Sequence, residues 1–232
     1  MTTSTSNPVA PPDPAERPAT FRAVLGVPEF RALFGSFAVF MVGETVKMLA
    51  LAVLVYDRTG SSLLSALAYV VGFLPHALGG VLLLALADRW RPRALLVGYD
   101  LVRLVAVAVL ALGVLPPLAM VALVFVVGLF APVSTAVRNA LLPDLLGGDA
   151  YVLGRSMFTV AAGATQVLGF AAGGLLLGLV GPYGALWLTA ATCAITAIMI
   201  RWGVADRPRR VASADRPAAA AADHSAAAAP AD

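Results

Sequence analysis

The sequence predicts an all-α polytopic membrane protein with six transmembrane helices. Of its 232 residues, 60% are apolar and only 12% are charged, and its mean hydropathy is +0.88. In a soluble domain, about a quarter of all residues are charged. The apolar residues also fall into six runs of roughly 20, which is the helix length that crosses a hydrocarbon core about 30 Å thick.

The six apolar runs follow one another with short connections. We expect spans at Leu33–Tyr56, Leu63–Leu86, Leu95–Leu115, Leu118–Ala136, Met157–Val180 and Ala185–Trp202. The first, third and fifth connections are the turns DRTGSS, Pro116–Pro117 and GPYG. The second is the basic turn DRWRPR, and the fourth is the longer VRNALLPDLLGGDAYVLGRS. This order predicts one six-span bundle over residues 31–203. In the fifth span, Gly169–Gly173 and Gly174–Gly178 have the spacing at which membrane helices pack closely.

The two flanks of the bundle differ from it in composition. Residues 1–30 begin polar and proline-rich, without the apolar stretch of a signal peptide, and we expect a disordered cytoplasmic segment. Its end, ATFRAVLGVPEFRALF, suggests either a short helix on the inner leaflet or a plain linker. Residues 204–232 are rich in alanine and low in complexity, which predicts a second disordered cytoplasmic tail.

Basic residues predict the orientation of the bundle. With the amino terminus inside, thirteen arginines lie on the cytoplasmic side and only Arg58 lies outside, while Lys47 and Arg103 fall within spans. Cytoplasmic loops carry the excess of basic residues in membrane proteins. We therefore expect a cell membrane protein, in the plasma or inner membrane, with both termini in the cytoplasm. The same placement explains the net charge of +3 without a nucleic-acid partner.

Several polar residues lie inside the expected spans, where a charge costs roughly 2.5–3.5 kcal/mol. Glu44 and Lys47 lie three residues apart in the first span, and Asp100 and Arg103 repeat this spacing in the third. Such pairs share one helix face. His76 lies in the second span and Gln166 in the fifth.

The depth of these residues suggests a shared interior. At 1.5 Å per residue, Glu44, His76, Gln166 and Arg103 lie about 17, 15, 14 and 12 Å from the inner boundary. If they face inward, they line one central cavity. Each acid–base pair has two interpretations, a salt bridge that fixes helix rotation or a proton-coupling site, because midplane acids are typical of proton relays. Histidine is a further proton carrier, since imidazole titrates near neutral pH.

Other functional classes find little support in the sequence. The chain has none of the motifs H-E-x-x-H, G-x-S-x-G or G-x-x-x-x-G-K-[ST], so we expect neither an enzyme nor an ATP-driven pump. Cys193 is the single cysteine and lies in an apolar run, which indicates a packing residue. We expect no cofactor and no metal.

The connection after the second span carries a family signature. It reads LLALADRWRPRALL and resembles the loop of the major facilitator superfamily, of the form G-x-x-x-D-R-x-G-R-R. Asp88, Arg89 and Arg93 match this pattern. The departures are Leu84 and Arg91 in place of glycines and Pro92 in place of a basic residue. The segments VYDRTGSS, FLPHALGGVLLLALADRW, DLVR, RNALLPDLL and GFAAGGLLLGLVGP look like the branch that contains enterobactin and macrolide exporters, over roughly residues 30 to 200.

The resemblance implies the amino-terminal half of a secondary transporter. Relatives usually have two six-helix bundles that alternate access to a midplane site, and their loop aspartate, here Asp88, packs against the second bundle at the cytoplasmic gate. We therefore expect a proton-coupled exporter of small amphipathic molecules, drug- or siderophore-like, in which Glu44 carries the proton. Six spans are also consistent with a truncated product, a homodimer, or an accessory subunit that needs a second six-helix half.

Overall fold

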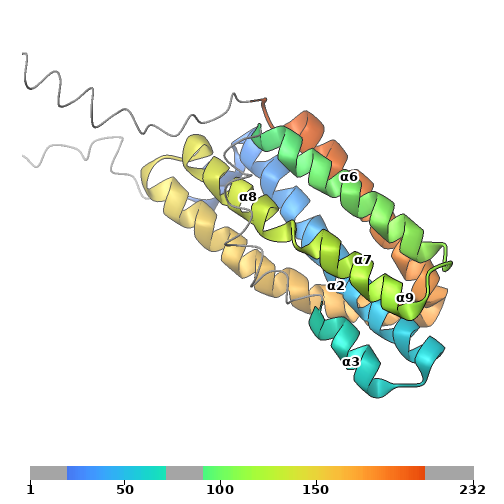
Figure 1. The fold of residues 1–232 in the computed structure, drawn as a ribbon. Helices are drawn as coiled ribbons and strands as arrows, with labels where there is room; N and C mark the ends of the chain where they lie inside the picture. Colours follow the sequence, from blue (N-terminus) through green and yellow to red (C-terminus); the bar gives the residue numbers. More distant parts are fainter. Residues whose placement is uncertain (1–19, 72–90, 207–232) are drawn as a thin grey trace, which may run out of the picture.

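The computed structural model describes residues 20–71 and 91–206. Within these residues every regular element is a helix, in agreement with the expected all-α class (Figure 1). The helices are α1 (Phe21–Leu25), α2 (Pro28–Thr59), α3 (Ser62–Val71), α6 (Pro92–Ala111), α7 (Pro117–Gly128), α8 (Ala131–Leu145) and α9 (Gly148–Gly203).

Four helices in the described residues are long and apolar enough to cross a membrane. They are α2, α6, the unit Pro117–Leu145 formed by α7 and α8, and α9. The apolar helix α3 begins where the second span was expected, but most of that span falls in residues 72–90, outside the described part of the chain. The count of six spans therefore stays a prediction.

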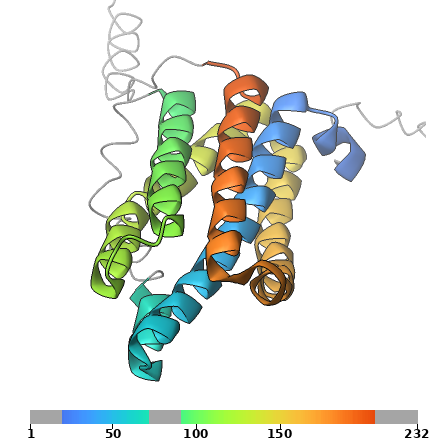
Figure 2. The ribbon, with the colours of Figure 1, turned by 90° about the vertical axis from the view of Figure 1, so that its right-hand side faces the viewer.

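A break at Gly181 divides α9 into two arms, residues 148–180 and 182–203. Gly181 has φ 70° and ψ 176°, a conformation that costs little only for glycine, and Pro182 follows it. Figures 1 and 2 show the second arm folded back beside α2 and α6. The arms match the expected fifth and sixth spans.

Glycines bring α2 and the first arm of α9 close together. A Cβ atom at Gly169 would lie 2.9 Å from Cβ of Thr45, and one at Gly173 would lie 2.6 Å from Cδ1 of Leu49. In contrast, Gly174 and Gly178 have nothing within 4 Å of such an atom. The first Gly-x-x-x-Gly pair therefore packs within the bundle, and the second faces outward.

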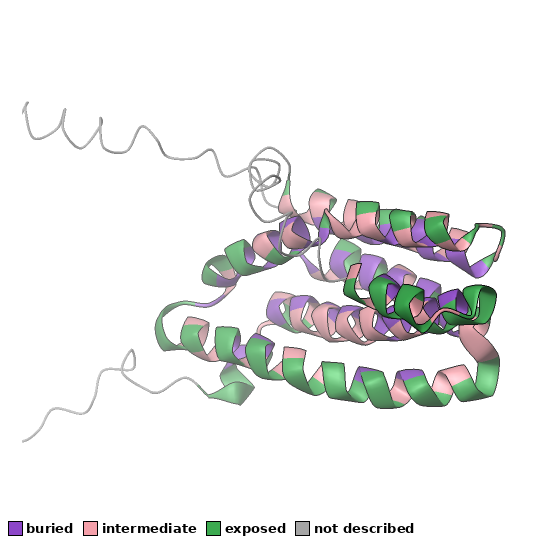
Figure 3. Cartoon of the chain, turned by 60° about the horizontal axis from the view of Figure 1, so that its bottom comes forward, coloured by how far each residue is buried: buried purple, intermediate pink, exposed green. Residues whose placement is uncertain are grey.

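The core consists of two apolar clusters, one toward each end of the bundle. Residues such as Leu51, Leu110 and Leu186 belong to one cluster, and Phe30 and Leu96 belong to the other. The buried residues line the inner helix faces (Figure 3). On α2 and α6, the polar positions predicted above lie between these clusters.

Connections meet at each end of the bundle. Arg58, at the end of α2, donates to the carbonyls of Gly113 and Leu115 and to the hydroxyl of Tyr183, each at 2.6 Å. The first, third and fifth connections are thus joined by one side chain. At the opposite end, Arg91 forms a 2.9 Å ion pair with Asp206 beyond α9. The first, third and fifth connections thus lie at one end of the bundle and the second lies at the other, as the expected order of spans requires.

Several helices extend beyond the expected span boundaries. Helix α2 begins at Pro28 instead of Leu33, α9 begins at Gly148 instead of Met157, and α8 continues to Leu145. Their polar ends remain helical because residues such as Phe30 and Leu142 pack into the core. The short helix α1 also contributes to the core through Val24, which is fully buried.

Candidate functional site

The expected pairs in α2 and α6 form ion pairs. Lys47 Nζ contacts Glu44 Oε1 within α2, and Arg103 Nη1 lies 3.4 Å from Asp100 Oδ1 within α6. Each pair is three residues apart, so one helical turn places both side chains on the same face. Asp100 and Arg103 are 0% and 1% exposed, and Lys47 is 6% exposed.

A third ion pair joins the two helices. Arg103 Nη2 lies 2.7 Å from Glu44 Oε2, so Arg103 binds one carboxylate on its own helix and one on α2. We call Glu44, Lys47, Asp100 and Arg103 the charge network. It contains two cations and two anions and is therefore neutral, which reduces the cost of burying charges within membrane spans.

Aromatic rings fix the orientation of Arg103. Its guanidinium lies 4.1 Å from the ring centroid of Phe40 and 5.7 Å from that of Tyr99. Both distances suit cation–π attraction. Within the described chain, Arg103 Nε and Asp100 Oδ2 are buried without a hydrogen-bond partner. The network thus has hydrogen-bonding capacity that the described residues leave unused.

Arg138 is a buried cation that sequence reasoning placed in the fourth connection. That placement is wrong, because Arg138 lies within α8 and is 4% exposed. Its Nη1 atom donates to Ser36 Oγ at 2.8 Å and to the Leu33 carbonyl at 3.4 Å. The apolar residues around it in sequence, Val137 and Leu141, indicated a helix face that packs inward.

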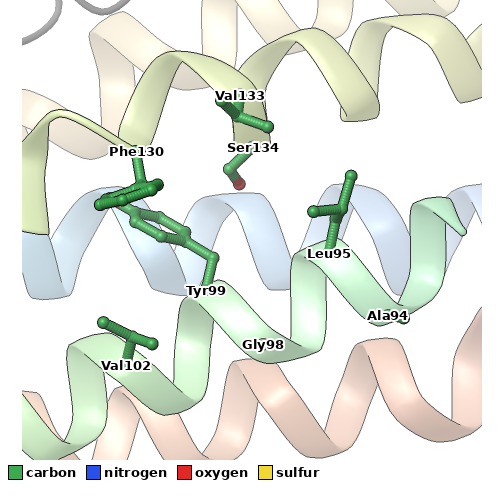
Figure 4. A pocket seen from close by; sticks show the side chains of 8 residues that line it. All are labelled: Ala94, Leu95, Gly98, Tyr99, Val102, Phe130, Val133 and Ser134. Atoms are coloured by element: carbon green, nitrogen blue, oxygen red, sulfur yellow. The ribbon is translucent and has the colours of Figure 1, made fainter. Parts of the chain in front are cut away.

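A cavity of about 310 Å³ lies between α6 and α8 (Figure 4). Its lining is nearly all apolar and includes Leu95, Val102 and Phe130. The hydroxyls in the lining belong to Tyr99, the neighbour of Asp100, and to Ser134, one helical turn before Arg138. The cavity can therefore hold an apolar group with a polar end.

The comparison with protein families decides the class of this protein. The model of the Major Facilitator Superfamily matches residues 32–229, which is most of the chain. The chain belongs to the major facilitator superfamily. No curated protein matches the chain. Members of this superfamily are membrane transporters, so the protein is a multi-pass membrane transport protein and its helices lie in a lipid bilayer.

The superfamily signature loop is only partly described. Asp88 and Arg89 lie outside the described residues. Arg93 donates to the backbone carbonyl of Arg201 at the end of α9, and its neighbour Arg91 binds Asp206. In this superfamily member, the described basic residues of the loop thus contact the end of α9 and the residue Asp206 that follows it.

The expected cavity shared by four midplane residues stays a prediction. The side chain of Gln166 is exposed on the first arm of α9 and, among the described residues, does not join the charge network. His76 lies outside the described residues. In residues 20–71 and 91–206, no group of three His, Cys, Asp or Glu side chains could hold a metal ion.

Proposed function

We propose that this chain is a six-helix unit of a proton-coupled exporter of small amphipathic molecules, similar to the branch of enterobactin and macrolide exporters. The observation that supports it is the charge network, where a buried carboxylate from α2 is bound by a guanidinium from α6. Glu44 is the proton carrier in this proposal. The bundle occupies residues 31–203, flanked by cytoplasmic segments 1–30 and 204–232, in a plasma or inner membrane.

Proton coupling follows from the ionic links of Glu44. When a proton binds Glu44, the carboxylate loses its charge and its ion pairs with Lys47 and Arg103 weaken. Arg103 keeps its second partner, Asp100. The contact between α2 and α6 is then weaker, while the pair within α6 persists. Protonation would thus bias the equilibrium between two helix packings, as coupled transport requires.

The substitution Glu44→Gln tests this role. The neutral amide imitates the protonated acid, so proton-driven efflux from proteoliposomes should fall to background while membrane insertion is unchanged. Asp57→Asn is the matched control, because Asp57 is an exposed acid at the end of the same helix. Proton-coupled efflux at the wild-type rate in the Glu44→Gln protein would contradict the proposal.

A second candidate is an accessory subunit or fragment that transports only with a second six-helix half or a second copy of the chain. The open face of α9 favours it, since Gly174 and Gly178 leave space for another helix. Gln166 is also exposed within this apolar span, where contact with lipid is costly. Flux by the purified chain alone would exclude a need for a different half, and zero flux restored by such a half would establish it.

A further inference from the structure

Arg138 differs from the other buried cations in its partners. Lys47 and Arg103 each bind a carboxylate, whereas among the described residues the hydrogen bonds of Arg138 go to the Ser36 hydroxyl and the Leu33 carbonyl. Its Nη2 atom is buried and has no hydrogen-bond partner among the described residues. A buried guanidinium without an anionic partner costs several kcal/mol. Among the described residues, Arg138 thus has a free hydrogen-bond donor at Nη2 and forms no ion pair with a carboxylate.

Arg138 gives the buried site an excess of positive charge. The formal charges of the charge network sum to zero, so the network and Arg138 together carry one net positive charge. Asp100 is close enough for its charge to act on Arg138, but it forms its ion pair with Arg103. The Phe40 ring, 5.6 Å from the Arg138 guanidinium, carries no charge. One anion would balance these five groups.

The cavity between α6 and α8 has part of its wall on the helix that carries this cation. Ser134 contributes a hydroxyl to the cavity wall and precedes Arg138 by four residues, so the two side chains lie on one face of α8. The Ser134 hydroxyl points toward the space between the helices in Figure 4. The remaining lining is almost entirely apolar. An apolar body with an anionic end fits this combination.

We propose that Ser134 and Arg138 bind the carboxylate of an amphipathic organic anion whose apolar part occupies the cavity between α6 and α8. As a statement of substrate class, the inference rests on the proposed export function. The site is distinct from the proton carrier, because Ser36, the partner of Arg138, precedes Glu44 by eight residues on α2. That separation is about 12 Å along the helix.

Equilibrium binding tests the proposal without a proton gradient. The full chain in phosphatidylcholine vesicles is titrated with a dansyl-labelled medium-chain fatty acid and with its primary amide. A charge-assisted pair should make the acid bind about tenfold more tightly than the amide. Arg138→Gln should abolish this preference, Arg138→Lys should retain part of it, and Arg155→Gln, at an exposed arginine of α9, should not change it.

Each other outcome is informative about the site. Equal binding of acid and amide to the wild-type protein, or an unchanged preference in Arg138→Gln, overturns the proposal and leaves water as the partner of Arg138. Displacement of the probe by phosphatidylglycerol, with no displacement by unlabelled fatty acid, assigns the site to a lipid head group and also overturns it. The Arg138→Lys protein keeps the charge and guards against loss of folding. Because binding is measured without flux, these results are independent of the Glu44→Gln test.

Discussion

Arg103 lies where α6 meets α2 and binds carboxylates on both helices. Its guanidinium is held by two ion pairs and by the faces of Phe40 and Tyr99, so its position is determined from several directions. A side chain with one partner could change rotamer at little cost. Arg103 can lose its bond to Glu44 and still remain attached to Asp100, so its two ion pairs can break separately.

Replacing Arg103 should destabilise the bundle strongly. Arg103→Ala leaves Asp100 as a buried carboxylate without its cation, and the free energy of unfolding should fall by about 3–5 kcal/mol. Thermal unfolding in detergent measures the change. Arg103→Lys should recover part of the loss, because it restores the charge but not the two-pronged geometry. An unfolding midpoint equal to that of the wild type would show that the network contributes no stability.

The ion pairs within one helix could be predicted from the sequence, but the pair between helices could not. Glu44 with Lys47 and Asp100 with Arg103 follow from three-residue spacing inside apolar runs. The link between Glu44 and Arg103 depends on how α2 and α6 are rotated against each other, which tertiary packing decides. The same limit applies to Gln166, whose exposed position on α9 could not be inferred from its depth in the span. Arg138 was missed because the polar residues around it resemble a loop and hide a buried helix face.

At the scale of helices, α2 is the central element and the first arm of α9 packs closely along it. This contact requires glycine at particular positions of α9, since any side chain at Gly169 would overlap Thr45. The glycines on the outer face of the same arm have no such neighbour. Gly169 therefore has no room for a side chain, whereas Gly178 in the same helix has room for one.

Alanine substitutions should separate these two faces. Gly169→Ala introduces a Cβ atom 2.9 Å from Cβ of Thr45 and should lower the free energy of unfolding by about 1–3 kcal/mol. Gly178→Ala meets open space and should be neutral or stabilising by up to about 1 kcal/mol, since alanine favours the helix. Thermal unfolding of both proteins in detergent compares them. Equal destabilisation by the two substitutions would contradict the assigned faces.

For the whole molecule, hydropathy predicted the all-α membrane class and the order of the described spans. Apolar runs of about 20 residues carry that information because the bilayer thickness sets their length. Helix ends were predicted less well, since Pro28, Leu145 and Gly148 extend helices through polar sequence that packing keeps ordered. The contacts of Arg58 could not be predicted at all. They join residues that are 55 to 125 positions away in the chain.

The contacts of Arg58 imply a gradient of helix displacement along the bundle. Because Arg58 joins three connections at one end, whereas Arg91 and Arg93 join one connection to the end of α9 at the other, helix movements should be smallest near Arg58. Backbone amides near Pro92 should then exchange with deuterium faster than those near Leu110, as mass spectrometry can measure. Arg58→Ala should raise exchange at the tied end by about tenfold, whereas an unchanged pattern would mean that apolar packing alone holds that end.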